Sequence, residues 1–144
     1  DITQDENLVD RNYDLITGFL FFLNSQENLR RRILEILVRK MSPDGVIIFN
    51  IHNSRPSLLW LQNWMMNFFR HCPKSSLSRA EVADLVANVN LEIIETYQIG
   101  VLPKVLHLIL RQKIWLRLDG MLRKMALLRT FASHVIYVCR YRSQ

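Results

Sequence analysis

The stretch Ser42-Pro43-Asp44-Gly45-Val46-Ile47-Ile48-Phe49 predicts a turn that leads into a buried strand. Proline presets φ for a turn and glycine permits positive φ, so residues 42–45 favour a turn. The run Val46–Phe49 carries no charge, which is typical of a central parallel strand that is covered on both faces. The rest of the fold is predicted outward from this strand.

A strand and a helix precede it. Residues 13–17 are apolar-rich and are followed by Gly18, which predicts a strand buried on both faces at its centre. Ser25 is a suitable N-cap for a helix over residues 26–40, because apolar residues recur there at helical spacing. Its apolar positions are Leu29, Ile33, Ile36 and Leu37, and Arg30, Arg31, Glu35 and Arg39 should point largely outward. Strand, helix, turn and strand together predict a βαβ unit with parallel strands.

Further elements follow downstream. Trp60, Trp64 and Phe68 recur at helical spacing within residues 56–69, and Ser78 with Glu81 forms a capping box that opens a helix ending near residue 88. The remaining pattern predicts a strand over 91–97, a helical region over 103–128 that is broken or kinked near Asp119-Gly120, and a last strand over 134–141. No linker marks a second domain.

The composition excludes several classes of protein. The chain has 144 residues, of which 49% are hydrophobic, with only 4 glycines and 4 prolines, so disordered and collagen-like chains are excluded. The longest run without a charge, residues 56–69, is too short to span a membrane. Cys72 and Cys139 are too few for a zinc site or a disulfide scaffold, and they predict reduced thiols in a cytosolic protein, with a single disulfide between them as the alternative. No metal site is expected, since His71 beside Cys72 is not ligand spacing.

The charge is unevenly distributed along the chain. Residues 1–98 contain 10 Lys and Arg against 12 Asp and Glu, whereas residues 99–144 contain 9 against the single acid Asp119. A solvated helical face accounts for this basic third, and contact with an anionic membrane surface or an acidic substrate is the sharper alternative. Nucleic acid is not expected as a partner, because no nucleic-acid motif accompanies the charge.

The order of these elements resembles the C-terminal half of a class I S-adenosylmethionine-dependent methyltransferase. Tyr13–Thr17 is similar to the fourth strand of that family, and Leu37–Ile48 resembles the passage into its fifth strand. Ser78–Ala87 followed by Leu91–Tyr97 looks like its next helix and sixth strand. His134–Tyr141 fits its seventh strand, which the family places antiparallel between the fifth and sixth.

The resemblance implies an α/β, Rossmann-like methyltransferase fold. Residues 1–144 would form the C-terminal portion of one domain, strands four to seven, with an antiparallel last strand and a helical insert over about residues 99–130 before it. The glycine-rich cofactor loop would lie upstream, since Gly18, Gly45, Gly100 and Gly120 form no such loop. This segment alone is therefore expected to be inactive, and to be poorly soluble or misassembled, as a fragment of a larger cytoplasmic transferase.

The same resemblance implies S-adenosylmethionine as the cofactor. The carboxylate of Asp1 would accept a hydrogen bond from the adenine amino group, and the backbone N–H of Ile2 would reach a ring nitrogen. Gly18 and Phe19 would lie beside the methionine part, with Gly18 letting the backbone approach the ligand. A plain turn at the end of a strand is the alternative explanation for Gly18.

Polar side chains follow the most apolar strand, where ligands bind in open α/β sheets. We expect His52 to act as a general base or to orient the methyl acceptor, with Asn50 positioning that acceptor and Asn53 in contact with it. Trp60 and Trp64 would line an apolar acceptor pocket. The structural alternatives are a loop histidine that makes only local hydrogen bonds and tryptophans that pack in the core.

Two other functions are weighed against methyl transfer to a small-molecule or lipid-like acceptor. The first is a non-catalytic α/β module that binds a membrane surface or a protein through its basic C-terminal third. The second is another Rossmann-like enzyme, such as a dehydrogenase, which an antiparallel last strand disfavours. The insert around Trp115 mixes basic and apolar residues, so it predicts either an ordinary packing helix or an interfacial helix that gives the protein a membrane-peripheral location.

Overall fold

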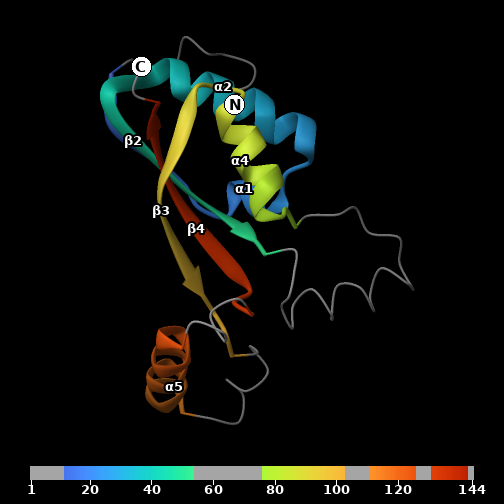
Figure 1. Ribbon diagram of the computed structural model, residues 1–144, viewed down its shortest axis with the longest axis vertical. Helices are drawn as coiled ribbons and strands as arrows, with labels where there is room; N and C mark the ends of the chain where they lie inside the picture. The colour runs from blue at the N-terminus through green and yellow to red at the C-terminus, as the bar shows by residue number, and fades with distance from the viewer. Residues whose placement is uncertain (1–11, 54–75, 103–110, 126–130, 143–144) are drawn as a thin grey trace, which may run out of the picture.

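The computed structural model describes residues 12–53, 76–102, 111–125 and 131–142 (Figure 1). The predicted helix over residues 56–69 lies outside this part of the chain. The described elements, in chain order, are β1 (Tyr13–Gly18), α1 (Phe21–Asn24), α2 (Glu27–Lys40), β2 (Met41–His52), α4 (Arg79–Ala87), β3 (Leu91–Ile99), α5 (Gln112–Lys124) and β4 (His134–Tyr141).

The four strands form one sheet in the order β1-β2-β4-β3. β1 pairs with β2 in parallel, which confirms the predicted βαβ unit. β4 pairs antiparallel with β2 on one side and with β3 on the other. The last strand therefore lies between its two neighbours in the reversed direction, as the family resemblance implied, and β1, β2 and β3 share one direction.

The turn predicted over residues 42–45 is wrong, because these residues lie inside β2, which starts at Met41 directly after α2. Tyr13 pairs with Met41 and Leu15 pairs with Val46, so the register shifts and residues 42–45 bulge out of the ladder. A Cβ at Gly45 would lie 2.8 Å from the Tyr13 carbonyl oxygen. Glycine is needed here for this close approach and not for positive φ.

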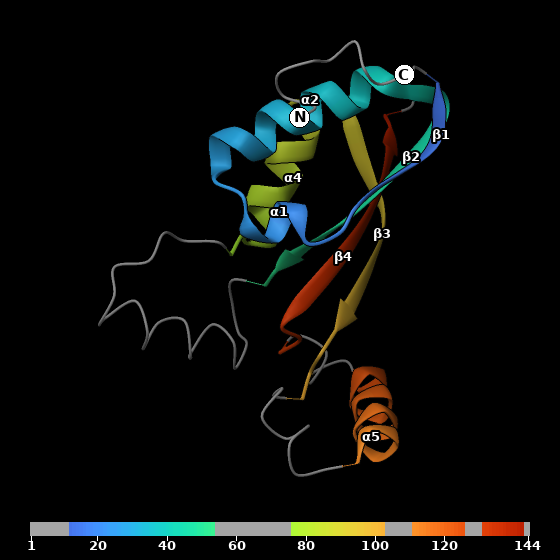
Figure 2. The same ribbon diagram turned by 180° about the vertical axis from the view of Figure 1, so that it is seen from behind.

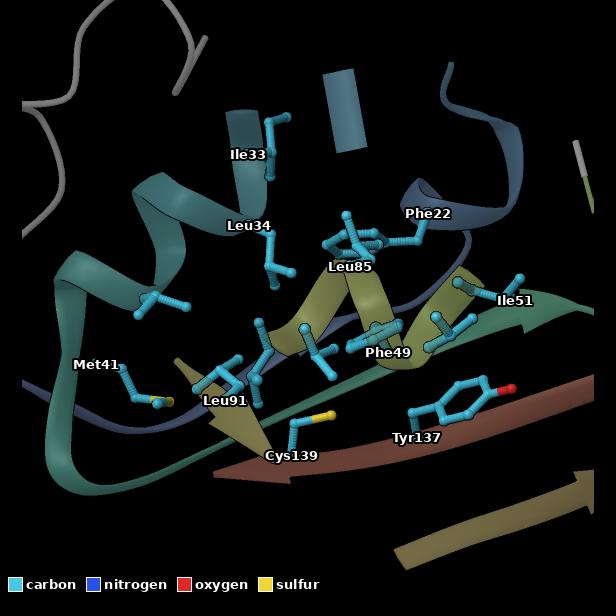
Figure 3. Close-up of a cluster of buried hydrophobic side chains, with 14 of the residues drawn as sticks. Phe22, Ile33, Leu34, Met41, Phe49, Ile51, Leu85, Leu91, Tyr137 and Cys139 are labelled. Carbon is cyan, nitrogen blue, oxygen red and sulfur yellow. The ribbon is translucent and has the colours of Figure 1, made fainter. Parts of the chain in front are cut away.

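The core lies between one face of the sheet and three helices. Helices α1, α2 and α4 all lie on this face in both views of the ribbon (Figures 1 and 2). Aromatic rings connect helix to sheet, since Phe22 lies 4.8 Å from Phe49, and Phe49 lies 5.7 Å from Tyr137, between ring centroids. Figure 3 shows these three rings among the buried aliphatic side chains of α2, α4 and β3.

Two predictions about burial are wrong. Arg30 is predicted to point outward but is 1% exposed. Its Nε donates a 2.7 Å hydrogen bond to the Phe22 carbonyl oxygen. The apolar Leu29, by contrast, is 39% exposed. β1 is predicted to be covered on both faces, but it is an outer strand of the sheet that the described residues form, and Leu15 is 59% exposed. An edge strand has one neighbour, so its side chains are less covered than those of β2.

The predicted capping box is confirmed at the start of α4. The Ser78 hydroxyl accepts a hydrogen bond from the Glu81 N–H, and the Glu81 carboxylate accepts one from the Ser78 N–H. Of the break or kink predicted near Asp119-Gly120, the break is wrong, because α5 continues through both residues. No helix in the described ranges is long and apolar enough to cross a membrane.

Candidate functional site

One edge of the sheet gathers the residues that the sequence singled out. β1, β2 and β3 run in the same direction, so their carboxyl ends at Gly18, His52 and Ile99 lie at one edge. The amino end of the antiparallel β4 lies there too, because His134 pairs with both His52 and Ile99. In open α/β sheets this edge is where ligands bind.

A pair of histidines lies at the centre of this edge. The His52 and His134 rings have centroids 4.7 Å apart and are inclined by 42°. Both residues are half-buried, and the Nδ1 atoms of both rings are buried. The two rings are therefore in contact across the antiparallel β2–β4 pair. The structure thus adds His134 to the predicted His52.

Asn50 lies two residues before His52 and points toward the end of β1. Its Oδ1 accepts a 2.9 Å hydrogen bond from the Leu20 N–H. Leu20 has a φ of 63°, a left-handed conformation that costs energy for a side chain of this size. Asn50 therefore holds the strained turn between β1 and α1 against β2, which is a positioning role in the structure as it stands.

Asn53 connects the end of β2 to the segment just before β4. Its Nδ2 donates to the Ala132 carbonyl oxygen at 3.1 Å, and its backbone N–H donates to the Ser133 carbonyl oxygen at 3.0 Å. The His52 carbonyl oxygen in turn accepts from the Leu77 N–H at 3.3 Å. These bonds connect the end of β2 to the segment just before β4 and to the segment just before α4. The His52 backbone is therefore held from both sides.

Gly18 has a structural explanation in this arrangement. A Cβ at this position would lie 2.7 Å from Cε2 of Phe22, so the Phe22 ring occupies the space that a side chain would need. Phe19, the next residue, is 49% exposed at the same edge. The packing of Phe22 is sufficient to require glycine here, and a contact of Gly18 or Phe19 with a cofactor stays a prediction.

Burial favours the protonated form of two core side chains, Cys139 and Tyr137. Burial raises the pKa of the Cys139 thiol to about 12, and burial likewise raises the pKa of the Tyr137 hydroxyl. A thiol that stays protonated is a poor nucleophile. Within the described ranges no group of three or more His, Cys, Asp or Glu side chains could hold a metal ion.

Four of the predicted site residues lie outside the described part of the chain: Asp1 and Ile2 on the cofactor side, and Trp60 and Trp64 on the acceptor side. The edge therefore brings together Gly18, Phe19, Asn50, His52 and Asn53 out of the predicted set. Two hollows of the described surface lie elsewhere, one of about 210 Å³ between α2 and α4 and one of about 240 Å³ beside β1 and α2. Neither is lined by the two histidines.

Comparison with known proteins gives similarity in structure and none in sequence. The chain matches no protein-family model and no curated protein by sequence. It is similar to the mitomycin 7-O-methyltransferase MmcR, with a TM-score of 0.60 and 12% identity, over 99% of this chain and 32% of that one. It is also similar to a SAM-dependent methyltransferase from Archaeoglobus fulgidus, with a TM-score of 0.60 and 11% identity, over 96% and 64%.

LepI in complex with SAM is similar too, with a TM-score of 0.59 and 10% identity, over 92% of this chain and 27% of that one. The chain thus spans between about a quarter and two thirds of the length of these structures. At such low identity the likeness establishes the fold and not the activity. The chain has a partial Rossmann-like fold of the kind found in S-adenosylmethionine-dependent methyltransferases.

Proposed function

We propose that the protein transfers a methyl group from S-adenosylmethionine to a small-molecule or lipid-like acceptor bound at the carboxyl edge of the sheet. The observation that supports this most is the sheet order, with the antiparallel β4 between β2 and β3. It is supported by the likeness to methyltransferases over nearly the whole chain. The same fold also occurs in a pericyclic reaction enzyme, so the transfer itself needs a direct test.

The described residues fit the cofactor only in part. Phe19 is exposed at the proposed edge, but the space beside Gly18 is filled by Phe22, and the proposed adenine contacts Asp1 and Ile2 lie outside the described residues. When bound, the cofactor supplies a methyl group that its sulfonium already activates, so the protein mainly has to align the acceptor and exclude water.

The residues of the edge have separate roles in this proposal. His52 accepts the proton of the acceptor hydroxyl, and the neighbouring His134 ring packs against the His52 ring. Asn50 acts as a positioning residue, because it fixes the turn after β1 through the Leu20 N–H. Asn53 fixes the end of β2 through its hydrogen bond to the Ala132 carbonyl oxygen. In this proposal it also contacts the acceptor.

The test has two stages on the intact protein. Calorimetry with S-adenosylmethionine measures binding, and release of S-adenosylhomocysteine is then followed across a panel of phenols, hydroxylated lipids and amines. Binding together with release on at least one acceptor supports the proposal. Absence of binding overturns it, and binding without release on any acceptor overturns methyl transfer in favour of a different use of the cofactor.

The base role is tested with His52→Gln against His134→Gln as the matched variant. We expect His52→Gln to lower kcat by about 10²–10⁴-fold and to abolish the rise of kcat with pH, as for loss of a general base. His134→Gln should lower kcat less and keep that rise, because this ring acts through His52. Equal pH profiles for His52→Gln and the unchanged protein would remove the base role while leaving methyl transfer intact.

A further inference from the structure

Four of the five exposed large apolar residues described on α5 lie along one side of the helix, and the fifth, Leu116, lies on another side. Ile114 is 48% exposed, Leu118 39%, Met121 65% and Met125 56%. Their spacing of four, three and four residues places them in a stripe along one side of the helix. Four exposed apolar side chains in line on one helix are more than scattered surface residues, and such patches usually mark an interaction site.

Cations lie directly beside this stripe. Lys113, Arg117 and Lys124 are all exposed, and by helical periodicity they share a side of α5 next to the stripe. We refer to these three cations and the four apolar residues together as the α5 surface. Long basic side chains can extend their charged ends away from an apolar layer while their stems remain in it.

The only acid of α5 is withdrawn from this surface. Asp119 is 2% exposed, and its Oδ1 accepts hydrogen bonds from the Val101 N–H at 2.8 Å and the Leu102 N–H at 3.1 Å. At 100° per residue, Asp119 lies opposite the centre of the α5 surface. The carboxylate therefore attaches α5 to the segment after β3. Because Asp119 faces that segment, the cations and the apolar stripe face away from the segment.

Among the described helices, none lies beside α5. α5 lies beyond the carboxyl end of β3, apart from α1, α2 and α4, in both views of the ribbon (Figures 1 and 2). α2 differs from it in chemistry as well. The outer side of α2 mixes the cations Arg31 and Arg32 with the exposed acids Glu27 and Glu35.

We infer that the α5 surface docks on an anionic lipid surface, with α5 lying in the plane of the interface. An amphipathic helix with apolar side chains beside a purely basic stripe binds such surfaces by immersing its apolar side while its cations meet the headgroups. Thirteen residues at about 1.5 Å each give a helix of roughly 20 Å, which lies along an interface and does not cross it. This inference stands whether or not the proposed methyl transfer is correct.

The test measures co-sedimentation of the intact protein with vesicles. One set contains phosphatidylcholine alone and the other equal parts of phosphatidylcholine and phosphatidylglycerol. We expect binding to the anionic vesicles only, and about thirtyfold weaker partitioning for the double variant Lys113→Gln, Arg117→Gln. Arg31→Gln, Arg32→Gln is the matched control, because it removes the same charge from exposed positions on α2 and should leave binding nearly unchanged.

Met121→Asn tests the apolar contribution separately. We expect partitioning at least about tenfold weaker, because the side chain no longer immerses. Met121 is 65% exposed, so the variant should retain the circular dichroism spectrum and melting temperature of the unchanged protein. Loss of binding with an unchanged fold supports the inference.

Three outcomes overturn it. Equal losses in the α5 and α2 double variants would show attraction by net charge alone. No binding to anionic vesicles, with a dimer in light scattering that Met121→Asn dissociates, would show that a second copy of the chain covers the surface. Retention of an acidic polypeptide by the protein, lost in Lys113→Gln, Arg117→Gln while vesicles are not bound, would show a protein partner.

Discussion

Replacing Gly18 by alanine tests why the end of β1 requires glycine. The new Cβ would lie 2.7 Å from Cε2 and 3.0 Å from Cδ2 of the Phe22 ring. Carbon atoms pack at about 3.5–4.0 Å, so the ring must move by roughly 1 Å. It is 0% exposed and lies against the Phe49 ring, with centroids 4.8 Å apart, so little room exists for that movement.

The expected change is a sum of two opposed terms. Overpacking of this size costs about 1–3 kcal/mol, whereas alanine restricts the unfolded chain and stabilises by about 0.4–1 kcal/mol. We therefore expect Gly18→Ala to lower the free energy of unfolding by up to about 2.5 kcal/mol, measured by urea unfolding. In a Phe22→Leu background the ring is gone, so the same alanine should be neutral or stabilising.

The change of sign is the decisive result. Gly100→Ala serves as the control, because Gly100 has a φ of 74° while the nearest atom to its Cβ position is 3.8 Å away, so its cost comes from backbone strain that Phe22→Leu does not relieve. If Gly18→Ala costs the same free energy with and without the Phe22 ring, the packing argument is refuted. A variant of unchanged stability that loses S-adenosylmethionine binding would instead support a cofactor contact at Gly18.

Two further predictions concern Asp119 and Cys139. Asp119→Ala removes the acceptor of the Val101 and Leu102 N–H groups, so we expect a loss of about 1–3 kcal/mol per orphaned group and faster hydrogen exchange of these two amides. Because burial raises the pKa of Cys139 to about 12, its peptide should remain unalkylated by iodoacetamide near pH 8 until urea unfolds the protein. For the same reason its contribution to stability is intact below the pKa of the unfolded thiol, about 8.5, and declines as the pH rises toward 12.

The parts of the fold that depend on local signals could be predicted from the sequence. β4 begins and ends where its β-branched and aromatic run does, at His134 and Tyr141, and α4 begins after the capping box at Ser78. The bulge at residues 42–45 could not be predicted from local signals, because Ser-Pro-Asp-Gly suits a turn. Only the pairing of Met41 with Tyr13, which is distant in sequence, makes these four residues part of β2. Arg30 was misplaced for a similar reason, because its partner is a carbonyl oxygen of α1.

In the candidate site, too, one residue could be predicted from local signals and another depends on strand pairing. His52 could be found locally, since polar residues after a charge-free strand mark the ligand edge of the sheet. His134 lies 82 residues later and opens a strand that reads as purely structural. Pairing the two strands antiparallel from their ends would have placed it opposite His52, so register was the missing signal.

Asn50 shows how the two strands of the edge depend on each other. A left-handed Leu20 is unfavourable by itself, and the bond from its N–H to Asn50 Oδ1 compensates for part of that cost. The segment that follows β1, with Phe19 exposed and Phe22 in the core, is therefore held by a side chain of β2. Asn50 and His52 are two residues apart on β2, so their side chains lie on the same face of the sheet. One strand therefore carries both the residue that fixes the proposed cofactor side and the proposed base. Any change in the position of β2 must move both sides of the site together, which makes this strand the element that aligns them.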